Sequence, residues 1–493
     1  MAQKNLPSAT PLQLIYEKGL RIFMLLLATF HMWISFARHY FAPENMISKS
    51  PILKTLFTAE KWAGLLLLAA VVFYLILSRI RFKSTWYRVK GFFKNLLSRE
   101  TVLLFCLFIY FVYCCHVQSR FYTNIFKNAD LFLFDLAVCI FIFFLLPIVI
   151  GANKAKLFVD ILLHIIMIVS TIFIGWALWN LLRQHLVTLP NGLQVGMTNT
   201  YSFYPGVNRN IGAAIGTTMV LISLYMIATH RWPIKVIYGL AMMLHLFATL
   251  LTNSRSNYLA LLCAFPLFVF MLVWLSSQSL GTVKRIILSC TAAVVTAVAF
   301  WQLRYLVFWL FEQKTHLSEY LKTGKDVVRD VGVDSARLKI WRSSLSQMVS
   351  SSERFFFGTP FGLIPKGIKE CMEKIYGKGS EFAHAHNIII QTGLLAGVPG
   401  MLLFLGFLSS ILMPCVKIGI GIKENQSPGA FVLPIAVLSM LIVNMFEPFL
   451  MFYISVMACL FFLFCGYIVA INKETPQSVE PIIRQSQKKK KRK

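Results

Sequence analysis

Residues 252–258, with the sequence TNSRSNY, form a polar hinge between two long apolar runs. The hinge places one arginine, Arg255, among hydroxyls and amides that include Ser254 and Ser256. A guanidinium can hold phosphate oxygens through two parallel hydrogen bonds, and neighbouring hydroxyls add further donors. The hinge is therefore a candidate phosphate site. The alternative is an interfacial turn whose arginine extends toward the headgroups.

A second cationic segment, Asn208-Arg209-Asn210, follows residues 204–206 (YPG) and opens another apolar run. The N-terminus of a helix presents backbone N–H groups without partners, so an adjacent arginine such as Arg209 suits an anion. The alternative is an asparagine cap followed by an arginine that extends to the membrane surface.

The sequence His384-Ala385-His386-Asn387 stands directly before the apolar run that starts at Ile388. Imidazole exchanges protons near neutral pH and is the commonest general base, so His386 is a candidate proton acceptor. A surface or capping role for these histidines is the alternative. Two histidines two positions apart make only a weak metal site when no further ligand is near.

Residues 313–386 separate two apolar runs and are too long for a simple connector, which predicts short helices within them. One of these helices is expected over residues 334–342 (DSARLKIWR), with Asp or Ser as its cap. A helical period places Arg337 and Trp341 on one face, four positions apart. Arg337 is thus a further candidate for anion binding, or else a solvated structural cation.

The elements that carry these polar segments are apolar enough to lie in a membrane. Hydrophobic residues make up 57% of the 493 positions and charged residues only 14%, which excludes a soluble globular enzyme. A spanning helix needs about 20 apolar residues. The predicted fold class is therefore an all-α polytopic membrane protein with about twelve transmembrane helices. They are expected at 20–38, 62–79, 101–118, 130–150, 157–182, 209–229, 234–252, 256–275, 286–311, 387–415, 429–449 and 451–471.

The distribution of Lys and Arg predicts the orientation of these helices. With the N-terminus in the cytoplasm, the cytoplasmic segments hold 25 of the 48 basic residues and the short outer loops hold 8. Basic residues concentrate in short cytoplasmic loops, so both termini are expected to be cytoplasmic. The predicted domains are 1–312 (helices one to nine), the extracytoplasmic helical loop 313–386, 387–472 (helices ten to twelve) and the basic cytoplasmic tail 473–493.

Several other classes of protein are excluded by composition. Long apolar runs place the net charge of +28 beside a membrane rather than on nucleic acid. The ten Cys lie mostly inside apolar runs, which excludes a disulfide scaffold. No HExxH, paired CxxC, DxD, Walker A or GxGxxG pattern occurs, so no metal site and no nucleotide cofactor are predicted. The carboxylates in or near hydrocarbon are Asp135, Asp160 and Glu447, a poor set for a cation-coupled transporter.

In their order and spacing, these segments resemble the O-antigen ligase/polymerase superfamily of bacterial envelope glycosyltransferases, over roughly residues 200–450. No single motif is specific, and the combination carries the similarity. The residues that match are, in chain order, Ser254-Arg255-Ser256, then Asp334, Ser335, Arg337 and Trp341, the turn FGTPFG at 357–362, His386-Asn387, and Gly393, Gly397 and Gly400.

The resemblance implies a GT-C-like enzyme that needs neither a metal nor a cofactor. It assigns His386 as the catalytic histidine, Arg255 as a diphosphate-binding arginine and Arg337 as the loop arginine. Arg209 is a third diphosphate candidate, although it lies inside its turn where the family often has an arginine ahead of a Gly- and Asn-rich turn. The residues expected to support these four are Ser254, Ser256, Asn387 and Trp341.

Members of this superfamily transfer a glycan from undecaprenyl diphosphate to an acceptor hydroxyl outside the cytoplasmic membrane. The resemblance therefore implies a bacterial inner-membrane enzyme whose site faces the periplasm or exterior, with a lipid-linked glycan donor, a glycan or glycolipid acceptor and no nucleic acid partner. Polymerisation of polysaccharide repeat units is the expected reaction. Ligation to lipid A–core or another terminal acceptor is the first alternative. A polysaccharide or lipid-carrier exporter is the more distant one, and it predicts polar residues through the whole bilayer.

Overall fold

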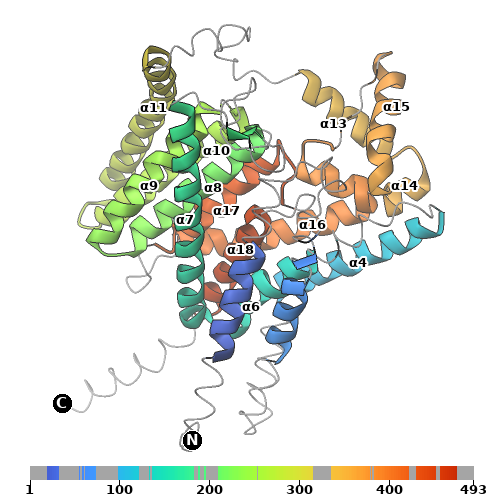
Figure 1. Cartoon of the computed structure of the whole chain (residues 1–493), viewed down its shortest axis with the longest axis horizontal. Helices are drawn as coiled ribbons and strands as arrows, with labels where there is room; N and C mark the ends of the chain where they lie inside the picture. Colours follow the sequence, from blue (N-terminus) through green and yellow to red (C-terminus); the bar gives the residue numbers. More distant parts are fainter. Residues whose placement is uncertain are drawn as a thin grey trace, which may run out of the picture.

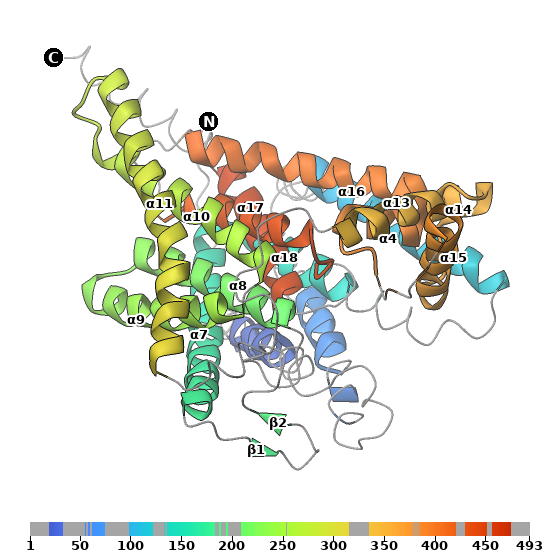
Figure 2. The ribbon, with the colours of Figure 1, turned by 90° about the horizontal axis from the view of Figure 1, so that it is seen from above.

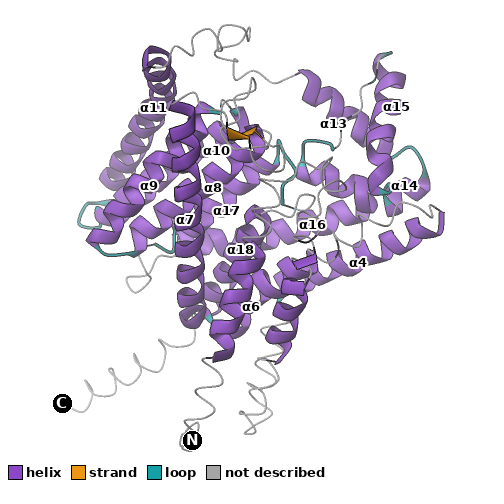
Figure 3. Ribbon diagram, in the orientation of Figure 1, coloured by secondary structure: helices purple, strands orange, loops and turns teal. Residues whose placement is uncertain are grey.

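Helices make up almost all of the structure, which is a computed structural model. Apart from isolated positions, the structure describes residues 19–32, 62–73, 98–121, 136–182, 209–252, 254–314, 335–377, 384–420, 429–450 and 456–474. Figures 1 and 3 show the helices. The two-residue strands β1 Val187–Thr188 and β2 Gln194–Val195 pair antiparallel. The helices are α4 Arg99–Phe121, η1 Cys139–Phe144, α6 Leu145–Ile150, α7 Ala152–Leu182, α8 Arg209–Thr229, α9 Trp232–Leu251, α10 Arg255–Ser276, α11 Thr282–Lys314, α13 Ser335–Met348, α14 Ser352–Phe357, η2 Phe361–Leu363, α15 Ile364–Tyr376, α16 Ile388–Ile420, α17 Val432–Asn444 and α18 Val456–Glu474.

The prediction of an all-α polytopic membrane protein is confirmed for the described residues. Eight of their helices are long and apolar enough to cross a membrane, and they lie in α4, α7, α8, α9, α10, α11, α16 and α18. The other four predicted spans coincide with shorter apolar helices, Gly19–Met32, Trp62–Phe73, Leu136–Ile150 and Val432–Asn444. At 1.5 Å per residue, these fall short of a hydrocarbon core of about 30 Å. A count of twelve spans stays a prediction.

The spanning helices differ in how far the protein encloses them. The most apolar windows of α8 and α18 are each 83% buried, whereas that of α11 is only 11% buried. Exposed residues on α11 include Val294, Val295 and Val298, which lipid rather than water would cover. Figure 2 accordingly shows α18 inside the bundle and α11 along one side. The core of the protein thus lies around α8, α17 and α18.

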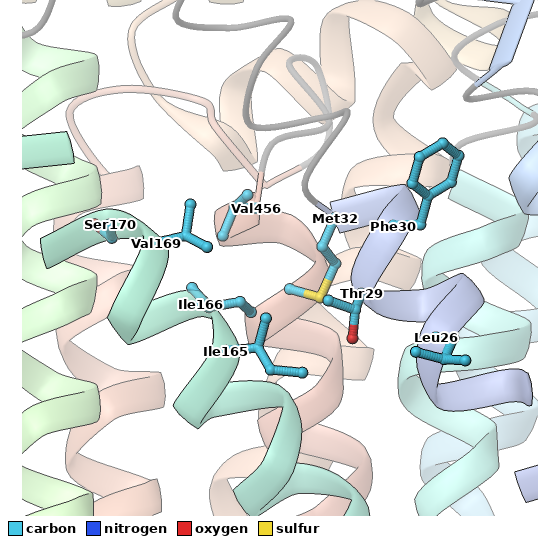
Figure 4. Close-up of a pocket in the computed structure, with 9 residues that line it drawn as sticks. All are labelled: Leu26, Thr29, Phe30, Met32, Ile165, Ile166, Val169, Ser170 and Val456. Carbon is cyan, nitrogen blue, oxygen red and sulfur yellow. The ribbon is translucent and has the colours of Figure 1, made fainter. Parts of the chain in front are cut away.

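An apolar pocket of about 220 Å³ lies between helix Gly19–Met32, α7 and the start of α18. Figure 4 shows its lining, in which Thr29 and Ser170 are the polar residue types among aliphatic and aromatic side chains. Leu26 and Phe30 at its rim are largely exposed. The lining of this cavity is therefore predominantly apolar.

Helices α13, α14 and α15 confirm the prediction that residues 313–386 contain short helices. The helix expected over 334–342 is α13, which begins at Ser335 and continues to Met348. These three helices gather beside α16 and the adjoining end of α4, as Figures 1 and 2 show. The extracytoplasmic position of this group is a prediction from the distribution of basic residues.

A kink in α16 joins this group to the bundle. Ala396 and Gly397 leave helical geometry, and Pro399 has no N–H to donate to Leu395 four positions earlier. Carbonyl groups at the kink that lack a donor within the helix accept hydrogen bonds from elsewhere. The Thr359 backbone N–H donates to the Leu394 oxygen at 2.6 Å, and Gln118 Nε2 donates to the Leu395 oxygen at 3.1 Å. The turn after α14 is therefore fixed to the kink by hydrogen bonds.

Replacing Gly358 by alanine should weaken the packing of the turn after α14 against the kink in α16. Gly358 has φ +77°, and a Cβ there would lie 2.3 Å from the Leu395 carbonyl carbon. The backbone conformation alone would cost about 1–3 kcal/mol, and the collision adds to it. Gly377 has φ +71° with nothing within 4 Å of a Cβ, so Gly377→Ala is a matched control that lacks the collision. Thermal unfolding in detergent should show a larger loss for Gly358→Ala; equal losses would contradict tight docking at the kink.

Candidate functional site

The carboxylate of Glu447 is the centre of a buried polar network in the turn between α17 and α18. Its side chain is only 4% exposed. Oε1 accepts hydrogen bonds from Asn210 Nδ2 at 2.8 Å and Arg337 Nη2 at 3.2 Å, and Oε2 lies 3.0 Å from His386 Nδ1. Three segments of the chain therefore converge on one acid, which agrees with the rule that buried charges are paired.

His386 is held in place by its own loop. It has φ +51°, a left-handed conformation that is uncommon for a residue with a side chain. The next residue, Asn387, caps α16, because its Oδ1 accepts the N–H groups of Ile389 and Ile390 at 3.0 and 3.1 Å. Gln391 Oε1 accepts the Ala385 N–H at 2.7 Å, which ties the loop to the first turn of the helix. The helix cap in this loop is thus Asn387 and not a histidine.

The contact with Glu447 determines which nitrogen of His386 can accept a proton. Burial by itself would raise the pKa of Glu447, but the hydrogen bond from His386 and the electrostatic contacts with His386, His384 and Arg337 outweigh it and lower the pKa. An ionised carboxylate can only accept, so Nδ1 of His386 carries the proton and Nε2 keeps its lone pair. The His386 side chain is 25% exposed and so remains accessible to a reactant.

His384 lies against His386, with ring centroids 4.1 Å apart. Its Nδ1 accepts the backbone N–H of His386 at 3.2 Å, which steadies the left-handed backbone there. Burial, and to a smaller extent the neighbouring His386, lower the pKa of His384 to about 4. His384 is therefore neutral at physiological pH.

Helix α13 supplies Arg337 and Trp341 from the face that the sequence predicts. The Arg337 guanidinium contacts Glu447, lies 5.4 Å from the centre of the Phe446 ring and is 21% exposed. The Trp341 ring lies 6.4 Å from the same phenyl ring. Among the described residues, the buried Nε1 of Trp341 has no hydrogen-bond partner. Both side chains thus anchor α13 on the turn that carries the acid.

The polar hinge at 252–258 joins the same network through Asn210. Ser254 Oγ donates to Asn210 Oδ1 at 3.0 Å, and Ser256 Oγ lies 3.4 Å from Ser254 Oγ. Asn257 Nδ2 donates to Ser254 Oγ at 3.0 Å and to the Asn210 carbonyl at 3.3 Å. Arg255 follows Ser254 directly as the first residue of α10 and is half-buried. The N-termini of α8 and α10 are therefore bound together beside the carboxylate.

Most of the residues predicted from sequence meet in this network. His386, Arg337 and Ser254 belong to it by direct contacts, and Asn387 adjoins it through a hydrogen bond from its Nδ2 to the Met445 carbonyl at 3.3 Å. Arg209 opens α8 next to Asn210, but its side chain lies outside what the structure describes. Among the helices that carry these residues, α17 packs against α8, α10 and α16, and α13 packs against α16.

Glu447 is a candidate functional residue that the sequence patterns did not single out for a role. A signal for it exists, because it is one of three carboxylates in or near the apolar segments and such groups are functional candidates by default. It also supplies a potential metal ligand: donor atoms of His384, His386 and Glu447 all lie within 4.8 Å of one another. From the sequence, the two histidines alone make only a weak metal site, and the fold adds the Glu447 carboxylate as a third potential ligand.

Residues 240–405 match the family model described as O-antigen ligase. This stretch contains Arg255, Arg337 and His386, and it ends before Glu447. A search of curated proteins gives no match. The order of the polar segments, their convergence in space and the matched stretch agree with one another, and over residues 240–405 the chain is similar to the O-antigen ligase family.

Proposed function

We propose that this membrane protein transfers a glycan from an undecaprenyl diphosphate carrier to an acceptor hydroxyl, and that it polymerises polysaccharide repeat units. The observation that carries the proposal is the 3.0 Å contact between His386 and Glu447, which leaves the other imidazole nitrogen ready to accept a proton. Arg337, on the same carboxylate, places a cation beside that base. A base next to cations is the arrangement that a hydroxyl attack on a sugar diphosphate needs.

In the proposed reaction, the acceptor oxygen forms a bond to the anomeric carbon while the bond from that carbon to the diphosphate oxygen breaks. Nε2 of His386 takes the hydroxyl proton, and Glu447 stabilises the resulting imidazolium. The bonding electron pair leaves with the diphosphate. Arg255 and Arg337 neutralise its charge, with Arg209 as a third contact, so the step requires no metal ion. Attack from the face opposite the diphosphate inverts the anomeric centre.

The proposed location is the outer face of a bacterial cytoplasmic membrane. Its support is the distribution of basic residues, 25 in the predicted cytoplasmic segments against 8 in the short outer loops. In that orientation the N-terminal ends of α8, α10 and α16 face outward. Arg209 is the first residue of α8, Arg255 is the first residue of α10, and His386 lies just before α16. A site at the bilayer edge lets the lipid tail of the donor stay in hydrocarbon while its diphosphate meets the arginines.

The reaction can be tested by giving purified protein a diphosphate-linked donor and one acceptor at a time. A second lipid-linked repeat unit should yield a ladder of longer glycans, which is the polymerase result. A single addition to lipid A–core would identify a ligase instead. Movement of the donor across vesicle membranes without any new glycosidic bond would contradict transfer and favour an exporter.

Arg255→Lys is expected to slow transfer even though the positive charge is retained. Lysine cannot make the paired contacts of a guanidinium, and a charged hydrogen bond contributes about 1.5–3 kcal/mol, or roughly 10- to 150-fold in rate. Initial rates at varied donor concentration will measure the effect. Arg285→Lys is the matched control, since Arg285 stacks on Trp274 near the opposite end of the α10–α11 pair. A normal rate for Arg255→Lys would remove Arg255 from diphosphate binding.

A further inference from the structure

The pair of imidazoles and the carboxylate described above form a preorganised set of metal ligands. Donor atoms of His384, His386 and Glu447 lie within 4.8 Å of one another. Two imidazoles and one carboxylate are typical ligands of zinc, and they favour it over magnesium or calcium, which prefer oxygen. A site with three protein ligands keeps a fourth position open for water or substrate.

Contacts outside the set hold each ligand in position without a metal. Asn210 and Arg337 fix the Glu447 carboxylate through its other oxygen. The left-handed backbone at His386 and its N–H contact to His384 hold the two rings 4.1 Å apart. Such fixed partners orient ligands and reduce the ordering that binding requires. The cation of Arg337 opposes a second cation, so this site should bind zinc less tightly than a closed site with four ligands.

A metal ion in this position would conflict with the proposed transfer step. Coordination uses an imidazole lone pair and the carboxylate, and these are the groups that accept and stabilise the acceptor proton. We propose that His384, His386 and Glu447 form an inhibitory site for zinc-class divalent cations. The inhibition rests on the proposed function, whereas the binding does not.

Binding is tested first, on the purified full chain after treatment with EDTA and desalting. Calorimetric titration with Zn²⁺ should give one site per chain, and Co²⁺ should give the visible absorption of a four-coordinate ion. His384→Ala should weaken zinc binding at least tenfold. His384→Asn keeps an acceptor for the His386 N–H but removes the imidazole, so it should weaken binding equally while preserving the loop. His116→Ala, which changes an exposed histidine of α4, is the matched control and should bind zinc as wild type does. Absence of zinc binding by wild type, or binding as tight as wild type in both His384 variants, would overturn the site.

Inhibition is tested by measuring transfer at increasing Zn²⁺, with each variant scaled to its own rate without zinc. Wild type should lose activity as the site fills and recover it with EDTA, and both His384 variants should need at least tenfold more zinc. A rise in rate with zinc, or a fall with EDTA alone, would overturn an inhibitory role. Zinc binding without glycan transfer to any acceptor would refute the proposed function but support the zinc site. Glycan transfer without zinc binding would support the proposed function but refute the zinc site.

Discussion

His386→Ala is expected to abolish glycan transfer while the protein still inserts and folds. The imidazole is the proposed base, and loss of a general base slows a reaction by about 10²–10⁴-fold. The neighbouring His384 cannot replace it without rearrangement, because its Nδ1 accepts the His386 backbone N–H. The measurement is the initial rate with a saturating lipid-linked donor and acceptor, together with the unfolding temperature in detergent.

A second variant distinguishes the loss of the imidazole from strain in the backbone at this position. His386 has φ +51°, where alanine is strained and asparagine is better tolerated. His386→Asn should therefore keep the fold more fully than His386→Ala and remain equally inactive. His116→Ala serves again as a histidine changed elsewhere. Full activity in His386→Asn would remove this residue from the mechanism.

Glu447→Gln should reduce the turnover number by about 10²–10⁴-fold, nearly as much as the loss of the base itself. The amide is neutral and can present its NH₂ group to His386, so it neither stabilises the imidazolium nor selects the tautomer with a free Nε2. Gln is preferred to Ala because removing the side chain would leave Arg337 without its carboxylate and open a space in the buried network. The experiment measures kcat and the KM for donor separately. A positioning role predicts that kcat falls most, since His386 loses its orientation.

Asp160→Asn is the matched control, because Asp160 is another carboxylate within the helical bundle. It contacts Lys156 at 2.5 Å and Tyr225 at 3.0 Å, far along α7 and α8 from the network. The amide at this position should lower the unfolding temperature and leave kcat near wild type. If Asp160→Asn and Glu447→Gln reduce kcat equally, then Glu447 acts through general stability and not through His386.

Hydropathy and local patterns predicted much of the fold because they report interactions between neighbours in sequence. The helix over 334–342, the polar hinge at 252–258 and the apolar helices all follow from local periodicity and composition. The segment 429–449 shows the limit. Its helix ends at Asn444, whose Oδ1 accepts the Leu450 N–H at 2.9 Å. The apolar residues beyond it wrap a buried carboxylate rather than facing lipid, and a hydropathy average cannot distinguish these two environments.

The candidate site was only partly predictable for a related reason. Each basic or polar segment has a local composition that indicates its chemistry, so Arg337 and His386 could be named. Glu447 has no such local context, and its partners lie 61, 110 and 237 positions away in sequence. Its role depends on which helices pack together, which no short motif records. Asn210 was noted only as part of an anion-binding segment, and its bond to the acid is likewise a product of the fold.

These separations also determine when the enzyme becomes competent during its synthesis. Glu447 leaves the ribosome after every one of its partners, 61 residues later than His386 and 110 later than Arg337. At a translation rate of about 5–20 residues per second, Glu447 is synthesised roughly 3–12 s after His386. A nascent or truncated chain that already contains His386 and Arg337 therefore lacks the carboxylate that both side chains contact. In the proposed mechanism, catalytic competence therefore begins only after α17 and the turn that follows it are in place.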